Sequence, residues 1–338
     1  MDKQSENKKK VILTGDRPTG RLHLGHFIGS LKNRVKLQNE YRQFIIIADM
    51  QALTDHADNP KMVHENVLQL GLDYLSCGID PKVSTIFIQS LVPEIAELTM
   101  YYLNLVTVAQ LERNPTVKDE MKQKGFSKSV PAGFLVYPVS QAADITAFKA
   151  DLVPVGADQV PVLEQTNEVI KAFNRTYKTD VLIEIKALIS DVPRLSGIDG
   201  KAKMSKSLNN CIYLSDPSDV LKKKVFEMYT DPGHVGVSDP GKIEGNVVFE
   251  YLDAFDTDQK KVAELKEQYQ RGGLGDVVVK HYLFEVLDKM LEPIRNKRTE
   301  LEKNPVQVMK IIKEGTEKAR QTAIQTLKEV KEAMGLVY

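Results

Sequence analysis

Two short segments of the chain carry side chains that could handle a nucleotide. The first segment, residues 19–26, reads TGRLHLGH and follows a short apolar run at residues 11–14. His23 and His26 are three residues apart at the expected start of a helix, so both project from one side of its first turn. A helix start offers free backbone N–H groups, and imidazoles can donate hydrogen bonds to phosphate oxygens as their charge develops. Gly25 would let a nucleotide lie close to the backbone.

The second segment, residues 203–207, reads KMSKS and lies in a glycine-, lysine- and serine-rich stretch, residues 186–210, that we expect to form a mobile loop. Its two lysines, Lys203 and Lys206, are separated by small hydroxyl-bearing residues and could clamp a triphosphate. A solvated lysine and serine loop is the alternative interpretation. A five-residue match arises by chance about once in ten thousand times at average composition, which favours the functional interpretation.

The elements that position these segments alternate between two hydrophobic patterns. Apolar runs at 11–14, 44–48, 85–89 and 152–155 predict short buried strands, and helical spacing appears at 24–35 and 63–75. This alternation predicts an α/β fold with a Rossmann-like, doubly wound parallel sheet. Helical patterns dominate after residue 216, apart from a doubtful strand at 277–279.

Two domains are expected from this change of pattern. Residues 1–214 would form the Rossmann-type catalytic domain with both segments, and residues 215–338 an all-helical domain. The last helix should begin at Asn304 as its N-cap with Pro305 in the first turn, and it could pack back onto the first domain.

Composition narrows the class of protein only slightly. Lys plus Arg equals Asp plus Glu at 46 each among 338 residues, so the zero net charge neither indicates nor excludes a nucleic-acid partner. Cys77 and Cys211 lack the spacing of a metal site or a disulfide framework, which fits a reducing, cytoplasmic compartment. No signal peptide or membrane span is expected, and hence no membrane partner.

Together the two segments resemble the HIGH and KMSKS signatures of class I aminoacyl-tRNA synthetases. The stretches 14–20, 111–118, 137–144, 153–159 and 333–336 are similar to the bacterial tryptophan-specific members. The resemblance implies an ATP-dependent, AMP-forming ligase. Such an enzyme activates L-tryptophan to tryptophanyl-adenylate, releases pyrophosphate, and transfers the amino acid to tRNA(Trp). It also implies a homodimer, Mg²⁺ bound through the ATP phosphates, no metal site of the protein's own, and anticodon recognition by the helical domain.

The resemblance further assigns roles to individual residues. The catalytic set would be His23, His26, Lys203, Lys206 and Lys118. The ATP site would comprise Arg17, Pro18, Thr19, Gly25, His26, Gly156, Ala157, Asp158, Leu195, Lys203, Met204, Ser205, Lys206 and Ser207. The tryptophan pocket would comprise Tyr137, Gln141, Asp144, Gln159 and Gln51.

In that pocket, Asp144 would accept the indole N–H, and Tyr137 and Gln159 would hold the α-ammonium group. Tyr137, Gln141 and Asp144 are spaced to share one helix face. A buried carboxylate there needs a partner, and pairing with a lysine within the protein is the alternative to a ligand.

Three positions depart from the commonest bacterial pattern. Gln141, Gln51 and Arg17 stand where Met, His and Gln are usual, as in a second bacterial subgroup. The Tyr-x-x-x-Gln-Ala-x-Asp face also occurs in tyrosine enzymes, so tyrosine–tRNA ligase remains an alternative. A tRNA-independent adenylating ligase of the pantothenate-synthetase type and a non-catalytic RNA-binding paralogue are further alternatives.

Contacts with RNA would need a local cationic surface because the net charge is zero. Arg295, Lys297 and Arg298 are clustered in the helical domain and are candidates, with an ordinary solvated face as the alternative.

Overall fold

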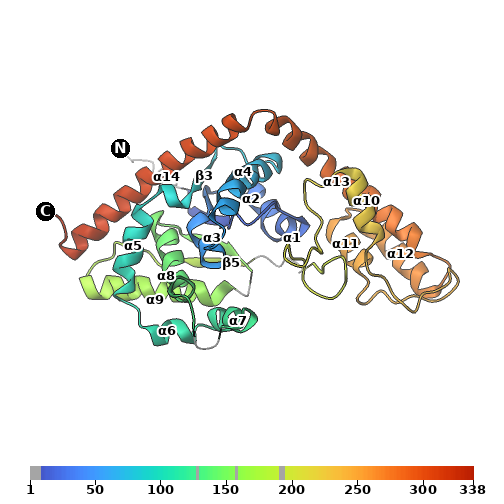
Figure 1. The fold of residues 1–338 in the computed structure, drawn as a ribbon, viewed down its shortest axis with the longest axis horizontal. Helices are drawn as coiled ribbons and strands as arrows, with labels where there is room; N and C mark the ends of the chain where they lie inside the picture. Colours follow the sequence, from blue (N-terminus) through green and yellow to red (C-terminus); the bar gives the residue numbers. More distant parts are fainter. Residues whose placement is uncertain (1–8, 127–128, 157–158, 190–194) are drawn as a thin grey trace, which may run out of the picture.

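The computed structural model describes residues 9–126, 129–156, 159–189 and 195–338. Its centre is a five-stranded parallel sheet in the order β3-β2-β1-β4-β5 (Figure 1). The strands are β1 (Val11–Asp16), β2 (Arg42–Ile47), β3 (Ser84–Ile88), β4 (Leu152–Val155) and β5 (Lys186–Ile189). The four predicted strands and the parallel α/β class are confirmed. The segment that forms the edge strand β5 was expected to be part of a loop. This strand is short, half exposed and begins with a lysine, so it lacks the apolar run that predicted the other strands.

Nine helices of the described ranges surround the sheet before residue 180. They are α1 (Leu24–His26), α2 (Lys32–Leu37), α3 (Asp49–His56), α4 (Pro60–Ser76), α5 (Glu94–Leu103), α6 (Val108–Arg113), α7 (Pro115–Gln123), α8 (Ala132–Ala147) and α9 (Val160–Tyr177). A π-helical turn, Phe27–Leu31, joins α1 to α2, and a 3-10 turn, Gln89–Leu91, follows β3. None of the helices in these or the later described ranges is both long and apolar enough to cross a lipid bilayer.

The rest of the chain is helical, with α10 (Ser218–Phe226), α11 (Val247–Phe255), α12 (Gln259–Arg271), α13 (Asp276–Glu302) and α14 (Pro305–Met334). The doubtful strand at 277–279 is wrong, because these valines lie in the first turn of α13, with only Val279 buried. The predicted start of α14 is confirmed: the Asn304 side chain accepts a hydrogen bond of 3.1 Å from the Gln307 N–H.

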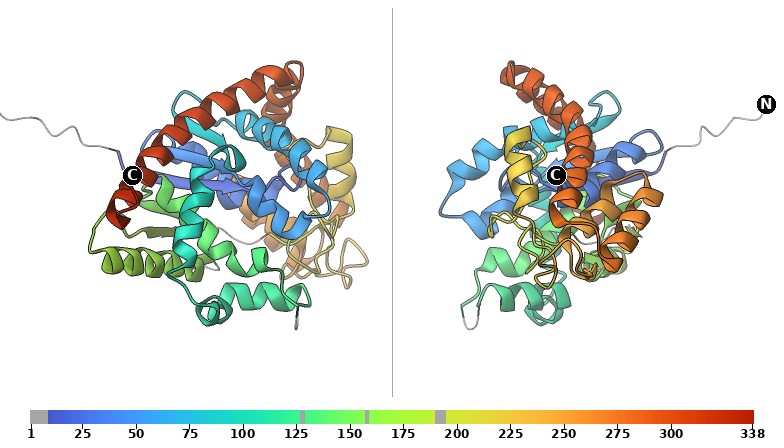
Figure 2. Two further views of the ribbon diagram at one scale, coloured as in Figure 1. Left: turned by 60° about the vertical axis from the view of Figure 1, so that its left-hand side comes forward. Right: turned by 90° about the vertical axis from the view of Figure 1, so that its right-hand side faces the viewer.

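The last two helices connect the helical region to the sheet. Helix α13 packs against α10 and α11 and also against α4, and α14 then runs along β3 (Figures 1 and 2). The Thr316 hydroxyl accepts a hydrogen bond of 3.1 Å from the Ile88 N–H, and Gly315 lies against the Ile86 carbonyl. Gly315 thus allows the helix to approach the strand backbone closely.

Alternating residues of β2 enter two separate cores. Phe44 and Ile46 pack with the residues beneath α5 and α8, whereas Ile45 and Ile47 join a cluster that continues into the helical region. Burial on both faces is typical of a central parallel strand and fixes its carboxyl end in place. The rigid strand ends are therefore a firm support for a site.

Candidate active site

A cavity of about 560 Å³ lies at the carboxyl ends of β1, β2 and β4. The chain crosses from one side of β1 to the other between β3 and β4, so this edge is the topological switch point at which open α/β sheets bind ligands. The cavity brings together eleven of the predicted site residues: Arg17, Thr19, Gly25, His26, Gln51, Tyr137, Gln141, Asp144, Gly156, Gln159 and Lys203.

The two histidines pack against each other at the start of α1. Their ring centroids are 3.8 Å apart. The Nδ1 of His23 accepts from the Gly25 N–H at 3.1 Å, and the Nδ1 of His26 accepts from the His23 N–H at 3.3 Å. Because each Nδ1 is an acceptor, the neutral tautomer of each ring carries its proton on Nε2, which is left to donate to a ligand.

Burial and neighbouring cations keep both rings neutral. Burial, followed by His26 and Lys206, lowers the pKa of His23 to about 2. Burial lowers the pKa of His26 to about 4, although Asp16 opposes that shift. Two neutral donors at a helix start can accept phosphate oxygens.

The second signature lies directly against the first. The Met204 sulfur is 3.3 Å from the Gly25 nitrogen, and Lys206 Nζ donates to the Gly20 carbonyl at 2.9 Å. Behind them, the Leu24 N–H donates to the Ile212 carbonyl at 3.0 Å. Segments separated by nearly 180 residues are thus held side by side. Of the two lysines, only Lys203 lines the cavity.

Asp144 lies on α8, is buried and lines the cavity. The side-chain amides of Gln51 and Gln89 donate to its carboxylate at 2.9 and 2.8 Å. The expected alternative, pairing with a lysine, is therefore wrong. Burial raises the pKa of Asp144 to about 8, with Gln89 lowering it and Asp49 raising it. Sequence reasoning missed Gln89, although a polar residue directly after a buried strand was the available signal.

Tyr137 and Arg17 also line this cavity. The Tyr137 hydroxyl is buried and makes no well-formed hydrogen bond within the described ranges; burial and the nearby Glu120 carboxylate raise its pKa. Arg17 donates to Asp55 at 2.6 Å, and Lys124 pairs with the same carboxylate at 2.7 Å. The unsatisfied hydroxyl beside an acidic group suits a ligand with both donors and positive charge, such as an α-ammonium group.

A network of side-chain hydrogen bonds at the end of β1 was also not predicted from the sequence. Asp16 accepts from Arg34 at 2.6 Å and from the Tyr74 hydroxyl at 2.8 Å. Burial alone would raise the pKa of Asp16, but Arg34 and the two hydrogen bonds hold it well below its usual range. The network fixes the turn that carries Arg17, since Asp16 precedes it directly.

Some predicted residues lie elsewhere or cannot be placed. Lys118 is exposed on α7 and does not line the cavity. Leu195 is buried, and its carbonyl accepts from the Met204 N–H at 3.1 Å. Pro18 is buried, Ser205 and Ser207 bond to each other at 2.9 Å, and Ala157 and Asp158 lie outside the described residues.

The RNA contacts predicted on α13 need a correction. Arg298 is 4 % exposed and forms a buried ion pair with Asp73 of α4, so it does not face solvent. Arg295 pairs with Asp288 at 2.6 Å, and the half-exposed Lys297 pairs with Glu300 at 2.9 Å. A run of cations in the sequence therefore does not form a free cationic surface here.

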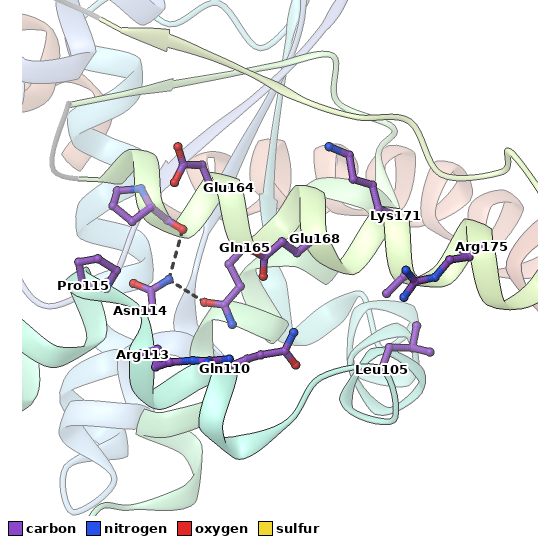
Figure 3. A pocket seen from close by; sticks show the side chains of 12 residues that line it. Leu105, Gln110, Arg113, Asn114, Pro115, Glu164, Gln165, Glu168, Lys171 and Arg175 are labelled. Atoms are coloured by element: carbon purple, nitrogen blue, oxygen red, sulfur yellow. Dashed lines mark hydrogen bonds between the residues drawn. The ribbon is translucent and has the colours of Figure 1, made fainter.

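A second cavity, of about 540 Å³, lies between α9 and the α6–α7 turn (Figure 3). Asn114 donates to Gln165 at 2.6 Å and to the Pro161 carbonyl at 3.2 Å, and the Gln165 Nε2 is buried without an acceptor in the described ranges. Arg113 and Arg175 also line this groove, and neither forms an ion pair with a described residue. Glu164 and Glu168 line the groove as well, so it offers free donors within a mixed set of charges.

Comparisons with known proteins agree with this geometry. Residues 4–292 match the family described as tRNA synthetases class I (W and Y). A tryptophan–tRNA ligase of Clostridium longisporum is 60 % identical over 98 % of both chains, and one of Streptococcus mutans is 60 % identical over 98 % of this chain and 99 % of the relative. A solved tryptophanyl-tRNA synthetase from Campylobacter jejuni, in complex with ADP and tryptophan, superposes with a TM-score of 0.85 at 33 % identity, covering 96 % of this chain and all of that one.

Proposed function

The chain belongs to the class I tRNA synthetases of the tryptophan and tyrosine group, and from this premise we propose that it acts as a tryptophan–tRNA ligase. Relatives named tryptophan–tRNA ligase are about 60 % identical to this chain over nearly their full length. This similarity favours tryptophan over the tyrosine and pantothenate-type alternatives. The observation that carries the proposal is a single cavity that is lined by the buried Asp144 together with His26 and Lys203.

In the first step, the carboxylate of tryptophan attacks the α-phosphorus of ATP, and pyrophosphate leaves. No nucleophile of the protein is needed, so the enzyme contributes orientation and charge stabilisation. Asp144 would accept the indole N–H in the cavity. Tyr137 and Gln159 would hold the α-ammonium group, and Gln141 and Gln51 would complete the pocket.

The phosphates would lie beside the two histidines. His23 and His26 would donate from their Nε2 atoms, and Lys203 and Lys206 would grip the leaving pyrophosphate. Arg17 would join them once it leaves Asp55. Lys118 and the stretch at 156–158 would contact the pyrophosphate and the ribose, respectively.

Mg²⁺ would enter with ATP, where it neutralises the charge on the phosphate oxygens. Of the three carboxylates that line the cavity, Asp16 is engaged by Arg34 and Tyr74, Asp144 by two glutamine amides, and Glu120 lies beside Tyr137. We therefore propose that the ion is held mainly through the phosphates.

In the second step, a terminal hydroxyl of tRNA attacks the adenylate. Phosphate contacts need cationic side chains that are free of protein partners. Because the α13 cations are paired, we propose that Arg113 and Arg175 contact tRNA in the groove beside α9, whose N-cap residue, Gln159, lines the active cavity. The helical region would recognise the anticodon, and two chains would form the dimer.

One assay tests the function: ATP–pyrophosphate exchange with each of the twenty amino acids in turn. Exchange with tryptophan alone supports the proposal, exchange with tyrosine alone favours the runner-up, and no exchange contradicts both. The RNA surface is tested separately. Arg113→Gln and Arg175→Gln should raise the KM for tRNA about tenfold and leave exchange unchanged, whereas the exposed Lys61→Gln on α4 should alter neither.

A further inference from the structure

A buried ion pair joins the helical region to α4 directly behind the first signature. Asp73 of α4 is fully buried, and Arg298 of α13 is 4 % exposed. The Nη1 of Arg298 donates to Oδ1 of Asp73, and its Nε donates to Glu302 at 2.9 Å. Apolar residues often replace such a buried pair with no loss of stability, so stability alone does not account for it.

The second oxygen of Asp73 reaches the signature itself. Oδ2 accepts a hydrogen bond of 2.7 Å from the backbone N–H of Leu22, the residue before His23. The carbonyl of Leu22 accepts from the Leu214 N–H at 3.0 Å. Leu22 directly precedes the histidine turn, and its backbone is therefore held on both sides. Its N–H is bound by α4, and its carbonyl is bound by the segment after the KMSKS signature.

The charge of Asp73 also acts on the second signature. Burial lowers the pKa of Lys206, while Asp16 and Asp73 act to raise it. Lys206 donates to Gly20, two residues before Leu22. Neither Asp73 nor Arg298 lines the cavity, so any effect on catalysis must be transmitted through these groups.

We propose that Asp73 and Arg298 are positioning residues for adenylate formation: Arg298 holds the Asp73 carboxylate, which in turn holds the Leu22 backbone so that the histidine turn faces the phosphates. The inference rests on the proposed function. It also gives α13 a route to the active site, since a shift of α13 displaces Arg298, then Asp73, and then Leu22.

Two double variants separate positioning from simple stabilisation. Asp73→Asn with Arg298→Met removes both charges but keeps an oxygen for the Leu22 N–H, whereas Asp73→Leu with Arg298→Met removes that acceptor too. Thermal unfolding establishes that each variant is folded. In pyrophosphate exchange, we expect kcat of the leucine variant to be at least tenfold below that of the asparagine variant, with the tryptophan KM equal in both.

Equal kcat values in two folded variants, or a tryptophan KM that rises together with the loss of kcat, would overturn the positioning role. If the leucine variant does not fold, Arg298→Met alone should lower kcat and Arg298→Lys should restore most of it; unchanged kcat in Arg298→Met would reject the proposal. A parent chain without tryptophan-dependent exchange would refute both the function and the positioning role, whereas an active parent with equal variants refutes only the latter.

Discussion

The side-chain amide of Gln89 donates to both oxygens of Asp144, at 2.8 and 3.0 Å. Both bonds, and the bond from Gln51, come from neutral amides, so no cation offsets the burial of the carboxylate. Burial therefore raises the pKa of Asp144 to about 8 even though Gln89 acts to lower it. A carboxyl group in this state favours a ligand that brings a hydrogen-bond donor into the pocket.

The first prediction concerns the pH dependence of stability. Because the pKa of Asp144 is about 8 in the folded chain and 3.8 for the ordinary carboxyl, the folded state binds more protons between these values. The free energy of unfolding should therefore fall as pH rises through this window. Asp144→Asn lacks this effect, so it should gain stability relative to the parent from pH 5 to pH 8, by about 1.4 kcal/mol per pH unit at most.

Urea unfolding of the parent and of Asp144→Asn at pH 5 and pH 8 measures this difference. A stability difference that is the same at both pH values would show that the carboxyl is not perturbed in this way.

The second prediction concerns substrate recognition. Asp144→Ala should lower kcat/KM for tryptophan in pyrophosphate exchange by about 10³-fold and leave the ATP KM within about twofold, because it removes the buried carboxylate that Gln51 and Gln89 hold in the cavity wall. Ser140→Ala is the matched control, because Ser140 lies on the same helix but does not line the cavity, and it should change kcat/KM by less than about twofold. An alanine variant that activates tryptophan as well as the parent does would exclude Asp144 from the pocket.

The third prediction concerns the ionisation of the histidines. Burial lowers the pKa of His23 to about 2 and that of His26 to about 4, so both rings should be neutral throughout pH 5.5–8. Proton NMR should show that the imidazole C2–H resonances of His23 and His26 do not titrate in this range. Assignment with His23→Asn and His26→Asn identifies them, and titration of either near pH 6.5 would contradict the local electrostatics.

The strands and the cavity end of the sheet could be predicted because buried parallel strands appear as continuous apolar runs. The edge strand β5 could not, because it begins with Lys186 and is only partly buried, which removes the apolar signal. For the cations of α13, helical spacing was a better guide to burial than the run of charges that suggested an RNA surface. Arg298 follows Leu291 and Ile294 at helical spacing on the buried face of α13.

The sequence does not show which side chains from distant segments pair with each other. Asp73 meets Arg298 across 225 positions, and Asp144 meets Gln89 across 55. Each of these residues is polar in an apolar pattern, which indicates that a buried partner exists. The identity of that partner depends on how the helices pack, and a single sequence does not specify it.

The fourth prediction concerns the second signature. Lys206→Ala should lower kcat of pyrophosphate exchange by about 10²-fold and change the ATP KM much less, since a lysine that grips the leaving pyrophosphate stabilises the transition state more than bound ATP. Lys201→Ala is the matched control, because that exposed lysine lies in the same loop and should alter kcat by less than about twofold. A change confined to KM would remove Lys206 from the transition state.

The fifth prediction tests how α14 supports the sheet. A side chain at Gly315 would clash with the Ile86 carbonyl, so Gly315→Ala should push α14 away from β3 and weaken the nearby bond from the Ile88 N–H to Thr316. We expect the free energy of unfolding to fall by about 2 kcal/mol, typical of overpacking in a core. Gly133→Ala in α8, which has open space around its Cβ position, should cost nothing or be slightly stabilising. Chemical denaturation of both variants measures the difference, and equal stabilities would mean that α14 is not packed as closely on the strand as its glycine implies.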